Sequence, residues 1–332
     1  MRWGIVGHGV IAPTFIEAAR GVGHDLVAVA GRDASRASDF ARDHAIEWST
    51  DDLRDLADRV EAAYVCTPHD GHRDASITLL EANVPVLCEK PLGVNAHQVE
   101  QMVEASRVSG TLLMEAMWTR HLPVMAACGD WIRQGRLGNV QMVEADFGFV
   151  APYTPSGRLW STNSAGGSLL DVGIYPLTMA DLAYKSLPLS FEADAVMSPT
   201  GVDARISVTA KYPNGGSAIL RSAIDLDLGR GARIVGTEGR IEIPDFWQAE
   251  RATLFSVVGE KVDEVEHPHR INGFEYQITE MARCLDYGTI ESPVIPHARS
   301  AALADLMDQI RSRVGVVYPA DTEASCDRDP PH

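Results

Sequence analysis

The sequence predicts an α/β protein in which a doubly wound parallel sheet is followed by a second domain with a mainly antiparallel sheet. Up to about residue 120, short apolar runs alternate with helical stripes, which is the pattern of parallel strands joined by crossover helices. A glycine-rich turn separates the first apolar run from the first helix. Farther along, strand-length segments alternate between apolar and polar residues and are punctuated by Gly/Asn turns.

Composition narrows the class of protein. A chain of 332 residues with 45% hydrophobic and 23% charged residues is typical of a globular protein, and its length favours two domains. The net charge of −17 argues against nucleic-acid binding and against attraction to anionic membrane surfaces. Five scattered cysteines indicate free thiols in a reducing compartment. Because no leader or membrane span is recognisable, we expect a cytoplasmic protein.

The first glycine-rich turn has the spacing of a dinucleotide-binding fingerprint. Gly7, Gly9 and Ala12 form the pattern G-x-G-x-x-A between a short apolar run and a helical stripe. In a Rossmann domain the first glycine makes the tight turn, the second admits a pyrophosphate, and the alanine permits close helix packing. Val10 and Ile11 complete this loop, where phosphates would meet the positive end of the helix. Such turns also serve purely structural roles, which is the alternative interpretation.

The second predicted strand, residues 26–30, ends where the fingerprint expects a ribose ligand. Its tip is Gly31, followed by Arg32, about 20 residues beyond the glycines. This arrangement leaves room for a 2′-phosphate and supplies a fork-shaped cation, so we expect NADP, with NAD as the alternative. A register shifted by one position would make Asp33 the ribose ligand. Arg32 as a solvated loop charge is the structural alternative.

A third strand, residues 62–66, runs into Thr67, Pro68 and, after a short loop, His72. A proline-containing turn at the tip of a parallel strand suits the wall of a cofactor site. His72 is either a contact to the cofactor or a plain loop histidine. Helices and one more strand are predicted nearby, over residues 51–57, 74–82, 98–108 and 111–114.

The next apolar run, residues 84–88, stops abruptly at Glu89, Lys90 and Pro91. The proline disfavours a helical Lys90, so the lysine is expected at the carboxyl end of a strand. Ligands bind at that end of an open parallel sheet. An ordinary surface lysine in a turn is the alternative.

After residue 120 the pattern changes to a linking helix and hairpin-connected strands. Such strands predict an antiparallel sheet that can leave one face free. Two late helices and a polar, proline-ended tail complete the chain. The elements are a helix over 123–134, strands over 140–150, 190–197, 204–212, 217–224, 233–235, 240–243 and 253–257, and helices over 273–287 and 298–314. We predict domains over 1–120 and 121–319, with a disordered tail over 320–332.

Several motifs of the chain together resemble those of a known family. Gly7-x-Gly9-x-x-Ala12, Thr67-Pro68-x-x-x-His72 and Glu89-Lys90-Pro91 look like the glucose-fructose oxidoreductase/inositol dehydrogenase/MocA family, and the segment 114–120 looks like its dimeric dihydrodiol dehydrogenase and NADP-xylose dehydrogenase branch. The resemblance extends to about residue 319. It implies hydride transfer at a sugar or diol carbon, a lysine beside the nicotinamide, and an open sheet whose free face serves dimerisation.

The segment 166–176 carries the second half of the predicted chemistry. It opens a helix that places Asp171 and Tyr175 four residues apart on one face. A tyrosine with its ordinary pKa of about 10 is a poor base, but a neighbouring ammonium favours the phenolate. We therefore predict an acid/base pair of Lys90 and Tyr175, with Asp171 binding substrate or orienting the lysine. Many family members are understood to carry histidine where this chain has Tyr175; the resembled branch uses tyrosine. A buried helix tyrosine and a helix-start carboxylate are the structural alternatives.

Four further residues are candidate walls for a polyol or ring substrate, namely Trp118, Arg120, Arg158 and Trp160. For each of them packing is an equally good explanation. The histidines and carboxylates show no metal-ligand spacing, and hydride transfer to nicotinamide needs no metal.

The sequence therefore favours an NADP-dependent dehydrogenase acting on an aldose or cyclic diol. A reductase of a keto- or anhydrosugar and an inositol-type dehydrogenase of the same fold stay open. So does a regulator that binds NAD(P) without catalysis, although it would be expected to lack the lysine or the tyrosine.

Overall fold

The computed structural model describes residues 1–326, which form two compact units. The first contains Met1–Trp118 and Arg270–Ala304, and the second contains Thr119–His269 and Asp305–Ser325. Sequence analysis had assigned residues 270–304 to the second domain. They belong to the first unit because helix α8 (Glu275–Asp286) packs against α1 (Ala12–Gly21), where Asn272 Nδ2 donates to the Thr14 carbonyl at 3.0 Å.

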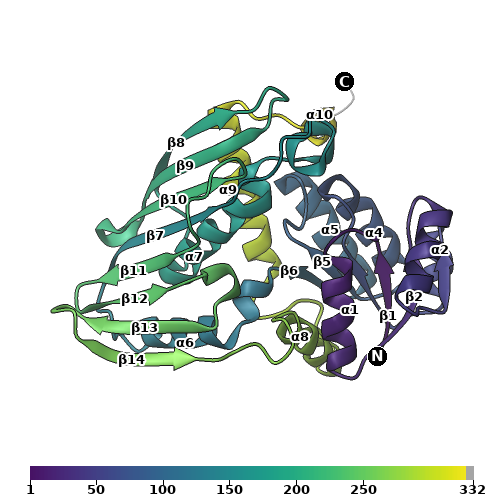
Figure 1. The fold of residues 1–332 in the computed structure, drawn as a ribbon, viewed down its shortest axis with the longest axis horizontal. Coiled ribbons are helices and arrows are strands. Elements are labelled where there is room, and N and C mark those ends of the chain that lie inside the picture. Colours follow the sequence, from purple (N-terminus) through teal and green to yellow (C-terminus); the bar gives the residue numbers. More distant parts are fainter. Residues whose placement is uncertain (327–332) are drawn as a thin grey trace. The chain divides into compact units, whose positions relative to one another are not determined.

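The first unit contains a six-stranded parallel sheet in the order β3-β2-β1-β4-β5-β6 (Figure 1). Its central strands are buried on both faces, which explains why they read as continuous apolar runs. This order and the parallel pairing are those of a doubly wound dinucleotide-binding sheet. The strands are β1 (Arg2–Val6), β2 (Asp25–Ala30), β3 (Trp48–Thr50), β4 (Ala62–Val65), β5 (Val86–Glu89) and β6 (Leu113–Ala116).

Helices cross over between these strands, and one of them escaped sequence prediction. Helix α2 (Ala34–Asp43) is mostly polar and buries only Ala37 and Ala41, so it has no apolar stripe to detect. The three-residue strand β3 that follows it was also missed. The other helices of this unit are α3 (Leu53–Ala57), α4 (His72–Glu81), α5 (Ala96–Ser109) and the first part of α9 (His297–Val314).

The second unit contains an eight-stranded sheet in the order β14-β13-β12-β11-β7-β10-β9-β8. All neighbours are antiparallel except β7 and β10, which pair in parallel. The predicted fold class, a doubly wound parallel sheet plus an α+β domain with a mainly antiparallel sheet, is confirmed. The strands are β7 (Val140–Gly148), β8 (Ser190–Met197), β9 (Asp203–Lys211), β10 (Ser217–Ala223), β11 (Ala232–Gly236), β12 (Gly239–Ile243), β13 (Arg251–Ser256) and β14 (Lys261–Glu266).

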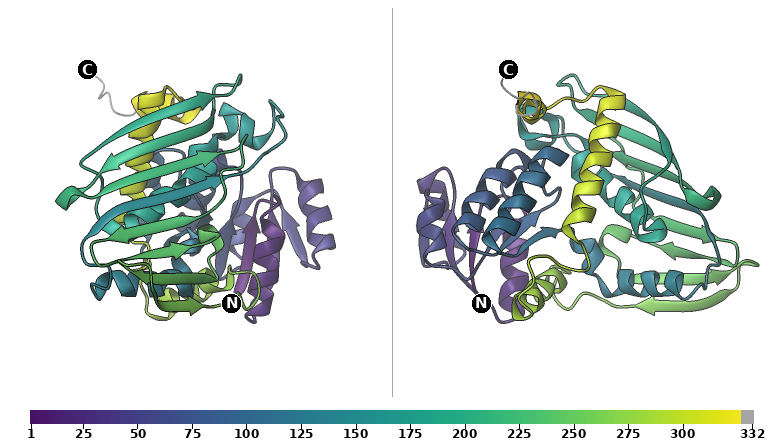
Figure 2. Two further views of the ribbon diagram at one scale, coloured as in Figure 1. Left: turned by 60° about the vertical axis from the view of Figure 1, so that its left-hand side comes forward. Right: turned by 180° about the vertical axis from the view of Figure 1, so that it is seen from behind.

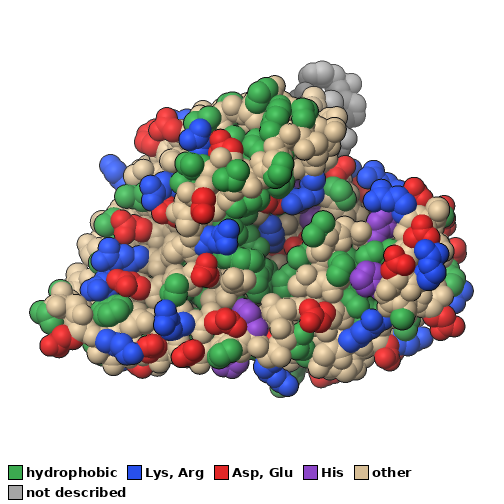
Figure 3. Space-filling model, viewed as in Figure 1, with side chains coloured by type: hydrophobic (Ala, Val, Ile, Leu, Met, Phe, Trp, Pro, Cys, Tyr) green, Lys and Arg blue, Asp and Glu red, His purple; other side chains and the backbone are tan. Residues whose placement is uncertain are grey.

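The two faces of this second sheet differ in character. One is covered by α6 (Pro123–Arg133), α7 (Ile174–Tyr184) and the second part of α9, whereas within the described residues the other carries no helix (Figure 2, left). The uncovered face carries cross-strand ion pairs, including Arg221 with Asp146 and Arg233 with Glu144. Acidic and basic side chains are accordingly interspersed over these strands (Figure 3). The predicted open sheet is therefore polar at its centre.

The end of the chain differs from its prediction. Residues 319–326 form helix α10 (Pro319–Cys326), where an unstructured tail was expected to begin at Ala320. Asp321 near the start of this helix accepts from the Tyr318 backbone N–H at 2.9 Å and pairs with Arg311, which explains the order. The rest of the predicted tail, residues 327–332, lies outside the described residues. Within residues 1–326, no helix has the length and apolarity needed to cross a bilayer.

Candidate active site

The predicted nucleotide-binding residues of the first unit follow the carboxyl ends of its parallel strands. Gly7 follows β1 and its N–H donates to the Ala30 carbonyl at 2.9 Å, and Gly31 follows β2. Lys90 directly follows β5, as its sequence context predicted. Because parallel strands share one carboxyl edge, these residues lie at the same edge of the sheet.

Gly7 and Gly9 have different steric environments. Gly7 has φ +99°, and a Cβ added to it would lie 2.8 Å from the Cys66 carbonyl oxygen and from the Thr67 nitrogen. A Cβ on Gly9 would meet nothing closer than that same oxygen at 3.9 Å. Gly7 is therefore required by the fold, whereas Gly9 leaves open space beside the loop.

The other residues of this loop differ in their exposure to solvent. Val10 is 98% exposed although it is apolar. Ile11 precedes α1, and Ala12, the first helical residue, is fully buried as the fingerprint expects. The loop therefore presents backbone and one exposed apolar side chain at the start of a helix, and the positive end of a helix favours an anion.

The tip of β2 has the register that sequence analysis used. The strand ends at Ala30, so Gly31 and the exposed Arg32 occupy the tip. Asp33 is engaged otherwise: its carboxylate caps α2 by accepting from the Arg36 N–H at 3.1 Å. Sequence analysis missed His8, whose ring lies so close to Gly31 that a Cβ there would be 2.8 Å from it.

His72 is completely buried and connects two loops of the site. Its Nδ1 lies 2.9 Å from the Pro91 carbonyl oxygen and its Nε2 lies 3.0 Å from the Thr67 carbonyl oxygen. Burial lowers the pKa of the imidazole, whereas the two carbonyl contacts raise it. In the neutral form the ring has a single N–H and donates to only one of these oxygens. The structure thus places His72 behind the loops, where it holds them together.

Two buried carboxylates accompany Lys90, and the Lys90–Pro91 peptide bond is cis. Glu89 accepts from the Tyr64 hydroxyl at 2.6 Å. Glu115, at the end of β6, accepts from the Leu92 N–H at 3.0 Å and from the Ser300 hydroxyl at 2.5 Å. Burial raises the pKa of both carboxyl groups, and the charge of Lys90 opposes that shift. Sequence analysis missed Glu115, although an acid at the end of a buried parallel strand was a usable signal.

The first unit suits a dinucleotide on two observations. The open space at Gly9 is the close approach that a pyrophosphate needs, and it lies beside a helix N-terminus. Thr67 Oγ1 is buried and has no hydrogen-bond partner among the described residues, so a donor or acceptor is available at the tip of β4. Gly7, Gly9, Thr67 and Lys90 are therefore the residues on which a nicotinamide dinucleotide would be held.

In the second unit, Asp171 and Tyr175 lie at the start of a long helical segment. Leu169–Gly173, labelled η5, forms a π-helical turn that continues into α7, where sequence analysis had expected a regular α-helix. Such turns are frequent at functional sites and change the spacing of side chains. Asp171 is buried and accepts from Arg158 at 2.8 Å, so the structure brings these two predicted site residues together.

Aromatic side chains surround Tyr175, which is only 5% exposed. The Phe147 ring centre lies 5.3 Å from the Tyr175 ring centre, and that of Trp247, in the short helical turn η7 (Phe246–Gln248), lies 6.5 Å away. Sequence analysis missed both because they come from distant parts of the chain. Their tilted and edge-on packing fixes the Tyr175 ring.

The remaining predicted substrate residues have partners of their own. Arg120 forms an ion pair with Asp181 of α7 at 3.0 Å. Trp160 is buried and donates its indole N–H to the Pro152 carbonyl at 2.9 Å. Trp118, at the end of the first unit, packs against Phe274 with ring centres 5.0 Å apart.

The start of the helical segment that carries Tyr175 is anchored by a residue that sequence analysis missed. Asp203 on β9 is fully buried, and its Oδ2 accepts from the Leu169 N–H at 2.7 Å and from the Ser168 hydroxyl at 2.8 Å. Asp203 therefore satisfies the helix start, a task that one interpretation of the sequence gave to Asp171. Burial raises the pKa of Asp203 to about 6.

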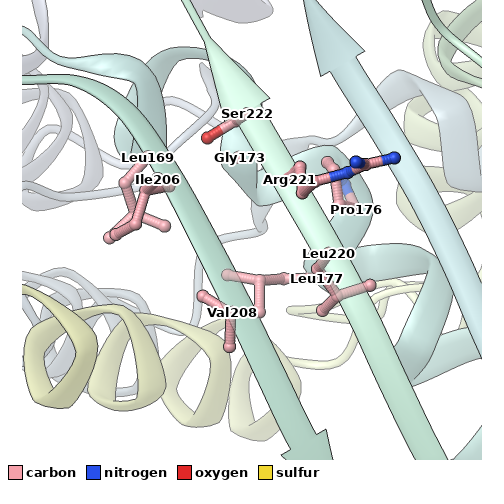
Figure 4. A pocket seen from close by; sticks show the side chains of 9 residues that line it. All are labelled: Leu169, Gly173, Pro176, Leu177, Ile206, Val208, Leu220, Arg221 and Ser222. Atoms are coloured by element: carbon pink, nitrogen blue, oxygen red, sulfur yellow. The ribbon is translucent and has the colours of Figure 1, made fainter. Parts of the chain in front are cut away.

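A small hollow lies beside this anchor, between the helical segment and strands β9 and β10 (Figure 4). Its lining is mainly apolar, with Ile206 and Val208 from β9 and Leu177 from α7. We interpret it as a packing gap, because neither Asp171 nor Tyr175 lines it.

Comparison with known proteins agrees with this architecture. Residues 1–117 match a family described as "Oxidoreductase family, NAD-binding Rossmann fold", and residues 125–242 match the GFO/IDH/MocA C-terminal domain. A mouse protein, trans-1,2-dihydrobenzene-1,2-diol dehydrogenase, is 36% identical over 97% of this chain and 99% of its own length.

Two solved structures share the fold. They are an aldose-aldose oxidoreductase from Caulobacter crescentus (TM-score 0.84, 23% identity, 95% of this chain and 97% of that one) and a levoglucosan dehydrogenase in complex with NADH and levoglucosan (TM-score 0.84, 18% identity, 95% and 97%).

Fold and site together define an NAD(P)-dependent dehydrogenase or reductase acting on CH–OH groups. The chain belongs to the glucose-fructose oxidoreductase/inositol dehydrogenase/MocA family, as its motifs indicated.

The two fingerprint glycines provide a matched pair of substitutions. Gly7→Ala should lower the free energy of unfolding by about 2 kcal/mol or more, because a Cβ at this positive φ meets backbone atoms. Gly9→Ala should leave the unfolding free energy within about 1 kcal/mol of the wild type and weaken dinucleotide binding about tenfold or more. Urea denaturation and calorimetric titration measure the two quantities. Equal destabilisation by both substitutions would contradict this division of roles.

Asp203 should make the free energy of unfolding depend on pH. Its pKa is about 6 when folded against 3.8 for an ordinary aspartate, so between these values the folded state holds the proton and stability falls as pH rises. Relative to wild type, Asp203→Asn should therefore gain about 2 kcal/mol of unfolding free energy between pH 4 and pH 7 in urea denaturation. The exposed Asp194→Asn is the control. A stability difference that is the same at both pH values would argue against a raised pKa of Asp203 in the folded protein.

Proposed function

We propose that the protein is an NADP-dependent dehydrogenase that oxidises a carbinol carbon of an aldose or cyclic diol, with Lys90 and Tyr175 as its acid/base pair. The observation that carries the proposal is Lys90 at the carboxyl end of β5, accompanied by the buried carboxylates Glu89 and Glu115. A lysine between acidic groups keeps its charge, and a charged lysine is what a tyrosine base requires.

The chemistry assigns a distinct task to each residue. A bound nicotinamide would supply the acceptor or donor of the hydride. Tyr175 Oη takes the proton of the substrate hydroxyl during oxidation and returns it during reduction. Lys90 favours the phenolate form of Tyr175 and so brings its pKa toward the working range. Asp171, held by Arg158, binds a substrate hydroxyl or orients Lys90.

The neighbours of Tyr175 support a ring-shaped substrate. Phe147 and Trp247 present aromatic surface at the tyrosine, and aromatic faces stack on rings and on the C–H faces of sugars. Asp171 and Arg158 supply polar groups suited to hydroxyls. The diol named for the mouse relative combines a ring with two hydroxyls, which favours a cyclic diol alongside an aldose.

The proposal extends to assembly and location. A homodimer or larger homo-oligomer would form through the uncovered sheet face, where cross-strand ion pairs leave polar groups available to a second copy. A cytoplasmic location agrees with Cys66, Cys88, Cys128 and Cys284, all of which are free thiols.

Tyr175→Phe tests the acid/base assignment. Absorbance of the reduced nicotinamide is followed with NADP and NAD over aldoses, inositols and trans-dihydrodiols. The wild type should turn over one of these classes, and the variant should lose about 100-fold or more in kcat with unchanged dinucleotide affinity. Tyr287→Phe is the control, because Tyr287 is 72% exposed. Turnover only of keto- or anhydrosugars, in the reductive direction, would favour a reductase. Tight binding without any turnover would favour a regulator.

Arg32→Ala tests the cofactor preference. If Arg32 pairs with a 2′-phosphate, the variant should lose about 10- to 100-fold in kcat/KM with NADP and change little with NAD. Arg54→Ala, an exposed arginine of the same unit, is the control. Equal kcat/KM values for NADP in variant and wild type would remove Arg32 from the proposal.

A further inference from the structure

Asp203 is a buried charge that the proposed chemistry does not use directly. It lies on β9 with no exposed surface, and one of its oxygens, Oδ1, has no hydrogen-bond partner among the described residues. Its other oxygen accepts two hydrogen bonds from the segment that leads to Tyr175, those of the Ser168 hydroxyl and the Leu169 N–H. A side chain with this arrangement fixes a backbone segment at a specific place.

The segment and the sheet approach each other without space for a side chain. Gly167 has φ +114°, and a Cβ on it would lie 2.2 Å from Asp203 Oδ1. A Cβ on Gly173 would lie 2.9 Å from Ser222 Oγ, which is itself 3.0 Å from Ser168 Oγ. The start of the helical segment therefore packs directly against β9 and β10, and these contacts set its distance from the sheet.

A second contact holds the same turn from the end of the chain. The Tyr318 hydroxyl donates to the Gly166 carbonyl. The Tyr318 ring lies under the Arg311 guanidinium at 4.8 Å, and Arg311 pairs with Asp321 at 2.6 Å and Asp308 at 2.5 Å. The turn before η5 is thus fixed on both sides, by Asp203 and by Tyr318.

A structural cap alone does not explain the charge of this anchor. Asparagine or serine can cap a helix start equally well without a buried ionised group. An ionised carboxylate makes stronger, charge-assisted hydrogen bonds to N–H groups at a helix start, where the helix dipole adds to the attraction. An ionised Asp203 therefore holds this turn by stronger hydrogen bonds than a neutral cap would make.

We propose that Asp203, in its ionised form, is a positioning residue that sets the orientation of Asp171 and Tyr175 by holding the Gly167–Leu169 turn on the sheet. This inference rests on the proposed role of Tyr175. Protonation of Asp203 removes the charge from both hydrogen bonds, loosens the turn and displaces the two side chains. Catalysis is sensitive to such displacements, since about 1 Å at the reacting groups can cost about 100-fold in rate.

Within residues 1–326, the charged and titratable groups around this carboxylate belong to three neighbouring parts of the chain. Tyr318 is the titratable side chain close to Asp203, and Arg311 and Asp321 lie beyond Tyr318. On the same strand Arg205 is paired with Asp225, and in the helical segment Asp171 is paired with Arg158. Because the hydrogen bonds from Ser168 and Leu169 favour the ionised form, their loss raises the pH at which Asp203 protonates.

The test compares kcat between pH 5 and pH 9 with the substrate identified from the panel above. In the wild type, kcat should fall below about pH 6 through a group that Asp203→Asn removes. In that variant kcat at pH 8 should be lower by about tenfold, while the dissociation constant of NADP stays within about twofold. Ser168→Ala should keep the acid limb but move it to higher pH. Asp194→Asn, an exposed control, should change none of these.

Hydrogen exchange gives a readout that does not need turnover. The Leu169 amide should exchange faster in Asp203→Asn than in the wild type and should exchange faster in the wild type at pH 5.5 than at pH 8, after correction for intrinsic rates. If Asp203→Asn does not fold, the shift in Ser168→Ala decides. Unchanged kcat and unchanged acid limb in the variants, with Tyr175→Phe inactive, would overturn the positioning role alone. Full activity of Tyr175→Phe would instead overturn the proposed function.

Discussion

Glu89 and Glu115 are buried away from water, where an isolated carboxylate is strongly disfavoured. Each is satisfied by hydrogen bonds, from Tyr64 to the first and from Leu92 and Ser300 to the second, and Lys90 supplies the compensating charge. The requirement that buried charge be paired thus organises the carboxyl edge of the parallel sheet.

The second unit meets the same requirement in a different way. Asp203 is buried beside a helix start, where hydrogen bonds from a backbone N–H and a hydroxyl group stabilise its charge. Burial raises its pKa, which means that ionisation near neutral pH lowers the stability of the fold. Because the charge of Asp203 lowers stability, a role in positioning the helical segment explains this residue better than a role in stabilising the fold.

Much of the first unit was predictable because its signals are local. Strand, glycine turn and helix follow within a dozen residues, and a proline after Lys90 marks the end of a strand. The residues that escaped prediction depend on partners far along the chain. Ser300 lies 185 residues from Glu115, and Asp203 lies 34 residues from Leu169. Helix α2 was not predicted because it is almost entirely polar, and the π-helical turn was not predicted because no residue type indicates one.

The two units also differ in what fixes the positions of their candidate site residues. The predicted nucleotide-binding residues are placed by backbone constraints, such as the positive φ of Gly7, which leave little freedom for substitution. The groups beside Tyr175 are instead side chains, Phe147 and Trp247, whose rings pack against the tyrosine. Changing those rings would reshape the surroundings of the tyrosine without disturbing the Asp203 anchor, which lies on another strand. The surroundings of Tyr175 can therefore vary in this fold while the orientation of the tyrosine is kept.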